Sequence, residues 1–328
     1  MTTPTRAEHA YQDSHHHHDR TGTARGSGAD PDQDTDRTTA ASSAPQPNGL
    51  PARILGRCVT AATHGVLICW ALAALVPLAW ALLSAFKDNS QLFTNPWGFP
   101  GSWHPANFAH AWNQANIGGY FVNTCLVVAG SMALTMLLGP MAAYVLARFT
   151  FPGNRFLYYL FMAGMTFPVF LALVPLFFVV KNFGLIGTPT GLILVYTAYS
   201  LPFTVFFMTG FFRTLPTAVA EAAIIDGCSQ EGVYFRIMLP MAKPGLISIG
   251  IFNFLSLWNQ FLLPMVLNPD QHKYVLSQGL AALAVQQGYQ GDWGALFAGL
   301  VISAMPVVGL YLAFQKRVQT GLSVGLLK

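Results

Sequence analysis

Residues 221–240 read EAAIIDGCSQEGVYFRIMLP and form the centre of the longest polar interruption in an otherwise apolar chain. A proline just upstream suits a first helical turn, so a short helix is expected over 217–226. Gly227 can end that helix in a left-handed turn without a side-chain clash. A second short helix is expected over 229–237, where Glu231 in the first turn is favoured by the helix dipole. The segment is therefore predicted to be a helix–turn–helix lying on a membrane surface.

This predicted helix pair displays Glu221 near its start, and its alanines keep the first helix thin enough for another protein to approach closely. Pro240 and Pro244 are expected to break the second helix before the next apolar run. One interpretation is a docking surface for a protein, and the other is a helix pair that contacts only lipid headgroups. A lipid-binding helix would normally carry more Lys and Arg on its polar face, which favours a protein partner.

The composition excludes an ordinary soluble domain. Hydrophobic residues make up 53% of the chain and charged residues 9%, against roughly 25% charged in a typical soluble domain. Seven of the thirteen acidic side chains fall within residues 1–50. The other six avoid the middle of every apolar run: Asp88, Glu221, Asp226, Glu231, Asp270 and Asp292. Such a distribution is typical of an integral membrane protein.

We expect two regions, a disordered polar tail over 1–52 and a membrane domain over 53–328. The tail is rich in Thr, Ser, Asp, Gly and Ala, so it cannot bury enough apolar surface to order itself. It is not expected to be a signal peptide, because no apolar core follows within the first 30 residues. The run His15–His18 could bind a metal or be a cloning remnant, but a floppy tract lacks the surroundings that tune a metal site.

The membrane domain contains six apolar segments of 20 residues or more, each long enough to cross roughly 30 Å of hydrocarbon as a helix. They cover approximately 59–86, 121–146, 156–180, 192–212, 246–267 and 295–314. Several contain proline, which a helix bundle tolerates because neighbouring helices satisfy the freed carbonyls. The predicted fold is an all-α integral membrane protein with six transmembrane helices.

Lys and Arg predict the orientation of these spans. If the N-terminus is cytoplasmic, the inner segments after residue 50 carry ten basic residues and the outer segments three. This bias follows the positive-inside rule. Both termini, the loop 213–243 and the tail 315–328 are therefore expected in the cytoplasm.

Two spans carry polar or aromatic residues that are candidates for contact with a solute crossing the membrane. In the fifth, the spacing of Asn253, Ser256 and Gln260 predicts one shared helical face. Polar groups at lipid depth usually face the bundle interior, where they either contact cargo or hold helices together by hydrogen bonds. Both interpretations stay open. The candidate pathway residues are Asn253, Ser256, Trp258, Asn259 and Gln260 in the fifth span and Tyr196 and Tyr199 in the fourth.

No sequence pattern for catalysis is present. The chain lacks the G-x-x-x-x-G-K-[ST], H-E-x-x-H and G-x-S-x-G motifs, so no phosphate cradle, zinc-protease pair or nucleophile elbow is expected. Its four cysteines are widely separated, which argues against disulfides and zinc. We therefore expect no catalytic residue, no metal and no cofactor. The chain itself is therefore not expected to be an enzyme, and any hydrolysis of ATP linked to its function would have to be carried out by a partner chain.

The helix–turn–helix pattern resembles the cytoplasmic "EAA" coupling loop of ABC transporter permeases. Over residues 55–328 the chain is more specifically similar to the smaller permease of the maltose-type carbohydrate importers. This similarity is carried by LSAFK at 83–87, NT at 123–124, AAYVLARFTFPG at 142–153 and SLWNQFLLP at 256–264. The resemblance assigns contact with an ATPase to the motif positions Glu221, Ala222, Ala223, Asp226, Gly227, Ile237, Leu239 and Pro240.

The resemblance also implies partners: a second, different permease, two copies of a cytoplasmic ATPase and an extracytoplasmic solute-binding protein, in the bacterial cell membrane and without nucleic acid. It implies import of a sugar, while polyols, glycerol phosphodiesters, osmolytes and amino-sugar oligomers stay open. A secondary carrier is the rival class. It would usually show an ionisable residue inside the membrane and an internal repeat. We find neither in the sequence.

Overall fold

The computed structural model describes residues 50–326, with side chains described for 58–286 and 291–315. Within this part of the chain every regular element is a helix, which agrees with the predicted all-α class. The chain divides into two compact units, Met1–Thr63 and His64–Lys328. Of the first unit, the described residues from Leu50 onward are helical. The candidate sites described below all lie in the second unit. Residues 1–49 of the predicted tail, including the run His15–His18, lie outside the described residues, whereas residues 50–52, also predicted as tail, form the start of α1.

Four single helices among the described residues are long and apolar enough to cross a membrane. They correspond to the first, second, fourth and sixth predicted spans: α1 (Leu50–Ser84), α4 (Ile117–Arg148), α7 (Pro189–Thr214) and α14 (Trp293–Leu326). Each contains an internal proline. These prolines do not interrupt the helices.

The third predicted span is two helices rather than one. α5 (Asn154–Thr166) and α6 (Val169–Asn182) meet at a bend of 105°. Phe167, between them, has an extended backbone with φ −73° and ψ 121°. The following Pro168 explains this conformation, because proline disfavours a helical residue before it and cannot donate a backbone hydrogen bond.

The fifth predicted span is also interrupted. α11 (Lys243–Trp258) ends before Asn259, and a short helix α12 (Leu262–Leu267) follows. Pro264 has no N–H to donate to the carbonyl of Gln260, four residues earlier. The hydroxyl of Ser277 donates to that carbonyl instead, at 2.7 Å. A side chain from another helix thus compensates for the bond that the proline removes. Two helix pairs, α5 with α6 and Gln230–Met241 with α11, are each bent by more than 40° at a short break, and counting each pair as one span gives up to six spans.

The segments between the spans contain further helices. α2 (Asn89–Thr94), α3 (Ala106–Ala109) and a π-helix η1 (His110–Gln114) follow α1. A 3-10 turn η3 (Gln271–Lys273) and α13 (Leu276–Gln290) occupy the loop before α14. Both segments lie outside the six predicted spans, and no helix was predicted in them.

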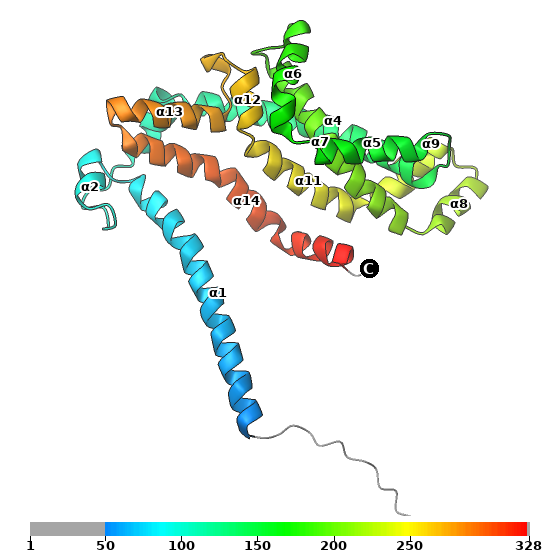
Figure 1. Cartoon of the computed structure of the whole chain (residues 1–328), viewed down its shortest axis with the longest axis horizontal. Helices are drawn as coiled ribbons and strands as arrows, with labels where there is room; N and C mark the ends of the chain where they lie inside the picture. The colour runs from blue at the N-terminus through cyan, green and yellow to red at the C-terminus, as the bar shows by residue number, and fades with distance from the viewer. Residues whose placement is uncertain (1–49, 327–328) are drawn as a thin grey trace, which may run out of the picture. The chain divides into compact units, whose positions relative to one another are not determined.

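The second unit has two buried apolar clusters. The first includes Tyr196, Trp258 and Leu276, and the second Tyr144, Phe212 and Met238. α4 and α7 run through both clusters and form the central helix pair. Figure 1 shows α8 (Thr217–Ile225) and α9 (Gln230–Gly232) at one end of this bundle and α13 toward the other.

Gly139 allows α4 and α7 to approach closely. A Cβ at this position would lie 2.5 Å from the Thr204 side chain, closer than real side-chain contacts permit. Small residues at helix contacts are typical of membrane bundles, because they let helix backbones pack tightly.

Candidate functional site

The first candidate site is the 217–241 element, which has the predicted helix–turn–helix form. α8 ends at Ile225, and Gly227 adopts the left-handed conformation with φ +84°. Ser229 then caps the second helix, its hydroxyl accepting a hydrogen bond from the backbone N–H of Gly232. Glu231 lies in the first turn, as predicted. The turn and both helix starts therefore follow from local sequence signals.

The second helix is longer than predicted. It continues through α9, a π-helix η2 (Val233–Met238) and α10 (Leu239–Met241), so Pro240 lies inside it rather than ending it. The wider π-helical turn accounts for this, since Leu239 N–H bonds to Tyr234 O, five residues back. The chain bends by 73° only after Met241, and Pro244 stands in the first turn of α11.

One side of the 217–241 element packs into the core. Ala223, Val233, Tyr234 and Met238 are buried. The ring centroid of Tyr234 lies 5.0 Å from the ring centroid of Tyr144 on α4. The methyl group of Ala223 is thus turned toward the bundle and is covered by this chain.

The other side is exposed. Ile225 is 86% exposed, and Ile224 and Phe235 add further apolar surface beside acidic side chains. Of the motif positions, Ile237 and Leu239 are half-buried, whereas the exposed ones are Glu221, Ala222, Asp226, Gly227 and Pro240. An exposed apolar patch rimmed by charge is typical of a protein-binding surface.

Arg148 attaches the element to the transmembrane helices. From the last turn of α4, its Nη2 donates to the carbonyls of Phe212 at 2.8 Å and Leu215 at 2.7 Å. These carbonyls lie at the end of α7, where a helix leaves its acceptors without partners. Arg148 lies within AAYVLARFTFPG at 142–153, but no role was predicted for it. Its position directly after the second predicted span, just before Phe-Thr-Phe-Pro, could have indicated a contact with the end of a neighbouring helix.

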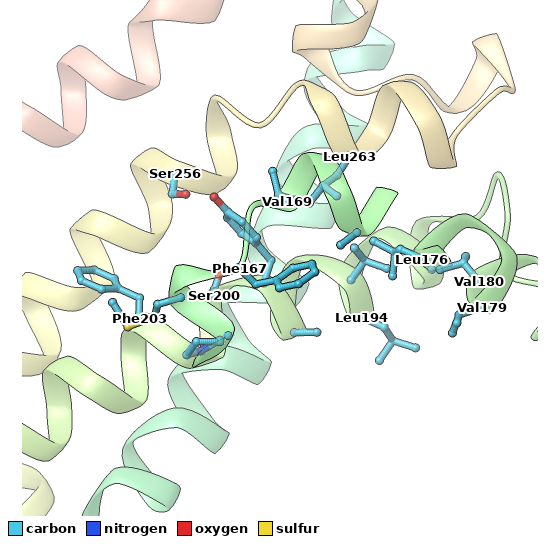
Figure 2. Close-up of a pocket in the computed structure, with 18 of the residues that line it drawn as sticks. Phe167, Val169, Leu176, Val179, Val180, Leu194, Ser200, Phe203, Ser256 and Leu263 are labelled. Atoms are coloured by element: carbon cyan, nitrogen blue, oxygen red, sulfur yellow. The ribbon is translucent and has the colours of Figure 1, made fainter. Parts of the chain in front are cut away.

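The second candidate site is a cavity of about 970 Å³ bounded by α5, α6, α7 and α11. Figure 2 shows Phe167, Leu176 and Leu194 on its apolar wall, with Ser200 reaching in from α7 and Ser256 from α11. The polar lining side chains are Tyr199, Ser200, Asn253 and Ser256. Three of the seven predicted pathway residues, Tyr199, Asn253 and Ser256, thus come together here.

These polar groups differ in their hydrogen bonding. Asn253 is 2% exposed, and its Nδ2 donates to Thr204 Oγ1 at 2.8 Å, which joins α11 to α7. The hydroxyl of Ser200 is buried and has no hydrogen-bond partner among the described residues. Tyr199 and Ser256 are exposed at the cavity. Ser200 was absent from the predicted set, since a lone serine in an apolar helix gives no sequence signal.

The other four predicted pathway residues do not line the cavity. Tyr196 is buried in the core, and Trp258 donates from Nε1 to Ser303 O at 3.1 Å. Asn259 donates to Leu255 O of its own helix. Gln260 lies beyond the end of α11, so the predicted face shared with Asn253 and Ser256 does not extend to it.

No group of three His, Cys, Asp or Glu side chains within the described residues has the arrangement of a metal site. The four cysteines are free thiols.

A bundle of apolar helices with a surface helix–turn–helix defines a membrane permease. The family model for the binding-protein-dependent transport system inner membrane component matches residues 135–324. The chain belongs to this family, and is therefore a multi-pass membrane transport subunit rather than a catalytic one.

Two curated relatives and one solved structure are similar over most of the chain. The diacetylchitobiose uptake system permease protein NgcG of Streptomyces coelicolor is 53% identical, covering 81% of this chain and 88% of the relative. The probable ABC transporter permease protein YurM of Bacillus subtilis is 38% identical over 80% of this chain and 86% of its own. A bacterial ABC transporter that imports the acidic polysaccharide alginate matches with a TM-score of 0.70 at 20% identity, covering 82% of this chain and 98% of that one. This last similarity concerns the fold.

Proposed function

We propose that this chain lines the translocation pathway of an ATP-driven importer for a neutral oligosaccharide, with an N-acetylated amino-sugar disaccharide as the first candidate. The observation that carries the proposal is the 970 Å³ cavity, which lies within the range of small-molecule sites. Its lining combines aromatic rings with hydroxyl groups and contains no Lys, Arg, Asp or Glu. Sugars offer hydroxyls and apolar ring faces, so this lining suits them. The 53% identity to a diacetylchitobiose permease supports the choice of solute.

The 217–241 element is proposed to dock the ATPase. Its exposed face offers Ile225 as an apolar anchor, with Glu221 and Asp226 beside it. Among the motif positions, Ala222, Gly227 and Pro240 lie on the accessible surface, and Ile237 and Leu239 are accessible in part. Ala223 has a different role in this proposal from the exposed motif positions, because it is buried and packs the element against the bundle.

The assembly is proposed to contain a second, different permease, two ATPase copies and an extracytoplasmic binding protein. The ten-to-three bias of basic residues supports a cytoplasmic position for both termini and for the docking element. ATP-driven closure of the ATPases would push on the 217–241 element. The helices would then rock between inward-open and outward-open states, with ATP shifting the populations.

Reconstitution tests the solute and the coupling together. The complete complex in proteoliposomes, supplied with its binding protein, should take up labelled N,N′-diacetylchitobiose only when ATP is enclosed on the ATPase side. Glycerol phosphodiesters serve as the charged comparison. ATP-dependent uptake of the phosphodiester at an equal or higher rate would refute a neutral-sugar pathway.

A further inference from the structure

A second hollow, about 410 Å³, lies between the start of α4 and the η3–α13 segment. It shares no lining residue with the membrane cavity. Tyr120, Gly279 and Leu283 form part of its lining. Its rim is made of side-chain amides together with His272: Asn113, Gln114 and Asn116 from the α4 side, and Gln271 and Gln286 from the α13 side. We refer to this hollow as the amide pocket.

The walls of the amide pocket are held together by hydrogen bonds. Asn123 Nδ2 donates to the carbonyls of His272 at 3.2 Å and Tyr274 at 3.0 Å. The backbone N–H of Leu276 donates to Thr124 Oγ1 at 2.7 Å. Gly279 packs so closely on the Tyr120 ring that any Cβ there would clash. The hollow is thus built into the framework between α4 and α13.

The amides that line the pocket differ from those that build its frame. The frame amide Asn268 donates to Lys273 O, and Gln278 donates to Asn268 O, both at 2.7 Å. By contrast, the five amides of the pocket are exposed and make no side-chain hydrogen bond with any described residue, so they are open to a ligand from solvent. Each carries a carbonyl acceptor and an NH₂ donor, so together they offer both functions to a ligand.

Asn116 is held in a costly backbone conformation. Its φ of +56° makes it the one non-glycine residue in the described part of the chain with a positive φ. Asn tolerates this left-handed region better than most residues, and backbone strain of this kind clusters at ligand sites.

The charges near the pocket are already paired. Asp270 and Lys273 form an ion pair at 3.3 Å, and the Lys273 ammonium also donates to Gly187 O. The hydrogen bond from the His272 backbone N–H lowers the pKa of the Asp270 carboxyl, and Lys273 lowers it further. No Lys, Arg, Asp or Glu lines the pocket itself. Its chemistry therefore suits a neutral ligand rich in hydroxyl or amide groups.

We propose that the amide pocket is a second solute site of this permease, which binds a neutral hydroxyl- or acetamido-bearing saccharide before it reaches the membrane cavity. The proposal rests on the proposed function for the class of solute and for the outward position of α13. Its binding chemistry rests on the five unpaired amides alone.

Photo-crosslinking can test the two sites separately. A diazirine derivative of N,N′-diacetylchitobiose would be irradiated with the complete permease–ATPase complex, without binding protein, and the labelled peptides mapped by mass spectrometry. We expect labelling of peptides within 111–120 and 271–286 that excess unmodified disaccharide abolishes. Gln271→Leu combined with Gln286→Leu should reduce this labelling at least about fivefold, because two hydrogen-bonding groups are lost.

Two controls keep the result interpretable. Gln315→Leu makes the same chemical change on α14, away from the pocket, and should leave the labelling unchanged. Labelling of cavity peptides within 164–203 should persist in the double variant, which shows that the variant is folded. Equal pocket labelling in the double variant, or no competable pocket labelling in the wild type, would overturn the amide pocket proposal. Failure of ATP-driven disaccharide uptake by the wild type would instead count against the proposed function.

Discussion

The guanidinium of Arg148 donates a hydrogen bond to the backbone carbonyl of Leu215 at 2.7 Å. Leu215 is followed by Pro216, the N-cap residue directly before the 217–241 element. The bond therefore joins the end of α4 directly to the junction between α7 and the element. A displacement of the element must move α4 and α7 together as long as this contact holds.

Replacing Arg148 tests this connection. Arg148→Met keeps much of the side-chain length but removes the guanidinium donor from both carbonyls, so that the Phe212 carbonyl keeps only the bond from Leu215 N–H. Hydrogen bonds to charged groups contribute about 1.5–3 kcal/mol each, so we expect a lower melting temperature and at least tenfold less solute moved per ATP hydrolysed. The measurement is uptake and ATPase activity in the same proteoliposomes. Arg155→Met, at an exposed position of α5, is the control. Normal coupling in Arg148→Met would contradict the assigned link.

Gly227 allows a test of the turn itself. Its φ of +84° lies far from the fixed φ of proline near −65°, and its N–H donates to Ile224 O. Gly227→Pro should therefore abolish uptake while leaving membrane abundance near normal. Gly227→Asn should retain most uptake, because Asn accepts the left-handed region. Uptake at the wild-type rate in the proline variant would be incompatible with docking of the ATPase on this element.

Asn253 is expected to act in helix packing rather than solute contact, because its amide already bonds to Thr204. Asn253→Leu should lower the stability of the assembled complex by about 1 kcal/mol, while uptake per assembled complex stays near the wild-type value. Thermal unfolding and uptake normalised to complex yield are the two measurements. A stable complex with weakened uptake would indicate instead that Asn253 contacts the solute.

Ser200 should behave in the opposite way. Its buried hydroxyl has no partner among the described residues, so Ser200→Ala removes an unsatisfied group and should leave stability unchanged or slightly raised. If the solute supplies the missing hydrogen bond, the solute concentration for half-maximal uptake should rise about two- to twelvefold. Ser248→Ala is the matched control, since the Ser248 hydroxyl bonds within α11 to Pro244 O. An unchanged half-maximal concentration would exclude Ser200 from solute binding.

The orientation can be tested with single cysteines in a background that lacks the four native ones. Phe93, Val285 and Ile225 have exposed side chains, so a cysteine at each position is accessible to a reagent. Phe93→Cys and Val285→Cys should react with an impermeant thiol reagent added outside intact cells. Ile225→Cys, at an 86% exposed position of α8, should react only after the membrane is opened. Labelling of Ile225→Cys from outside would reverse the proposed topology.

Local signals predicted the straight spans and the Gly227 turn, but they did not identify the two breaks. Proline alone does not distinguish them, since Pro140 and Pro202 lie inside continuous helices whereas Pro168 separates two. The outcome depends on distant partners, as the Ser277 hydroxyl illustrates at the carbonyl of Gln260.

The candidate sites were predictable to a similar extent. The pattern around Glu221 predicted the helix–turn–helix form of the 217–241 element, whereas the burial of Ala223 depends on how α8 rests on the bundle. Because α11 ends at Trp258, Gln260 does not share the helical face on which Asn253 lies. α13 was one of the helices that were not predicted, although Leu276, Leu280 and Leu283 repeat at helical spacing and are all buried.

The hydrogen bond between Ser277 and Gln260 gives the joint between α11 and α12 a mechanical role. Ser277 belongs to α13. Gln260 lies four residues after Ser256, a residue of α11 that lines the cavity. α13 and the cavity wall are thus connected through a hydroxyl group, which can release its partner without unravelling either helix. A fluorescent reporter attached at Val285, an exposed residue of α13, would therefore register rearrangements of the cavity wall.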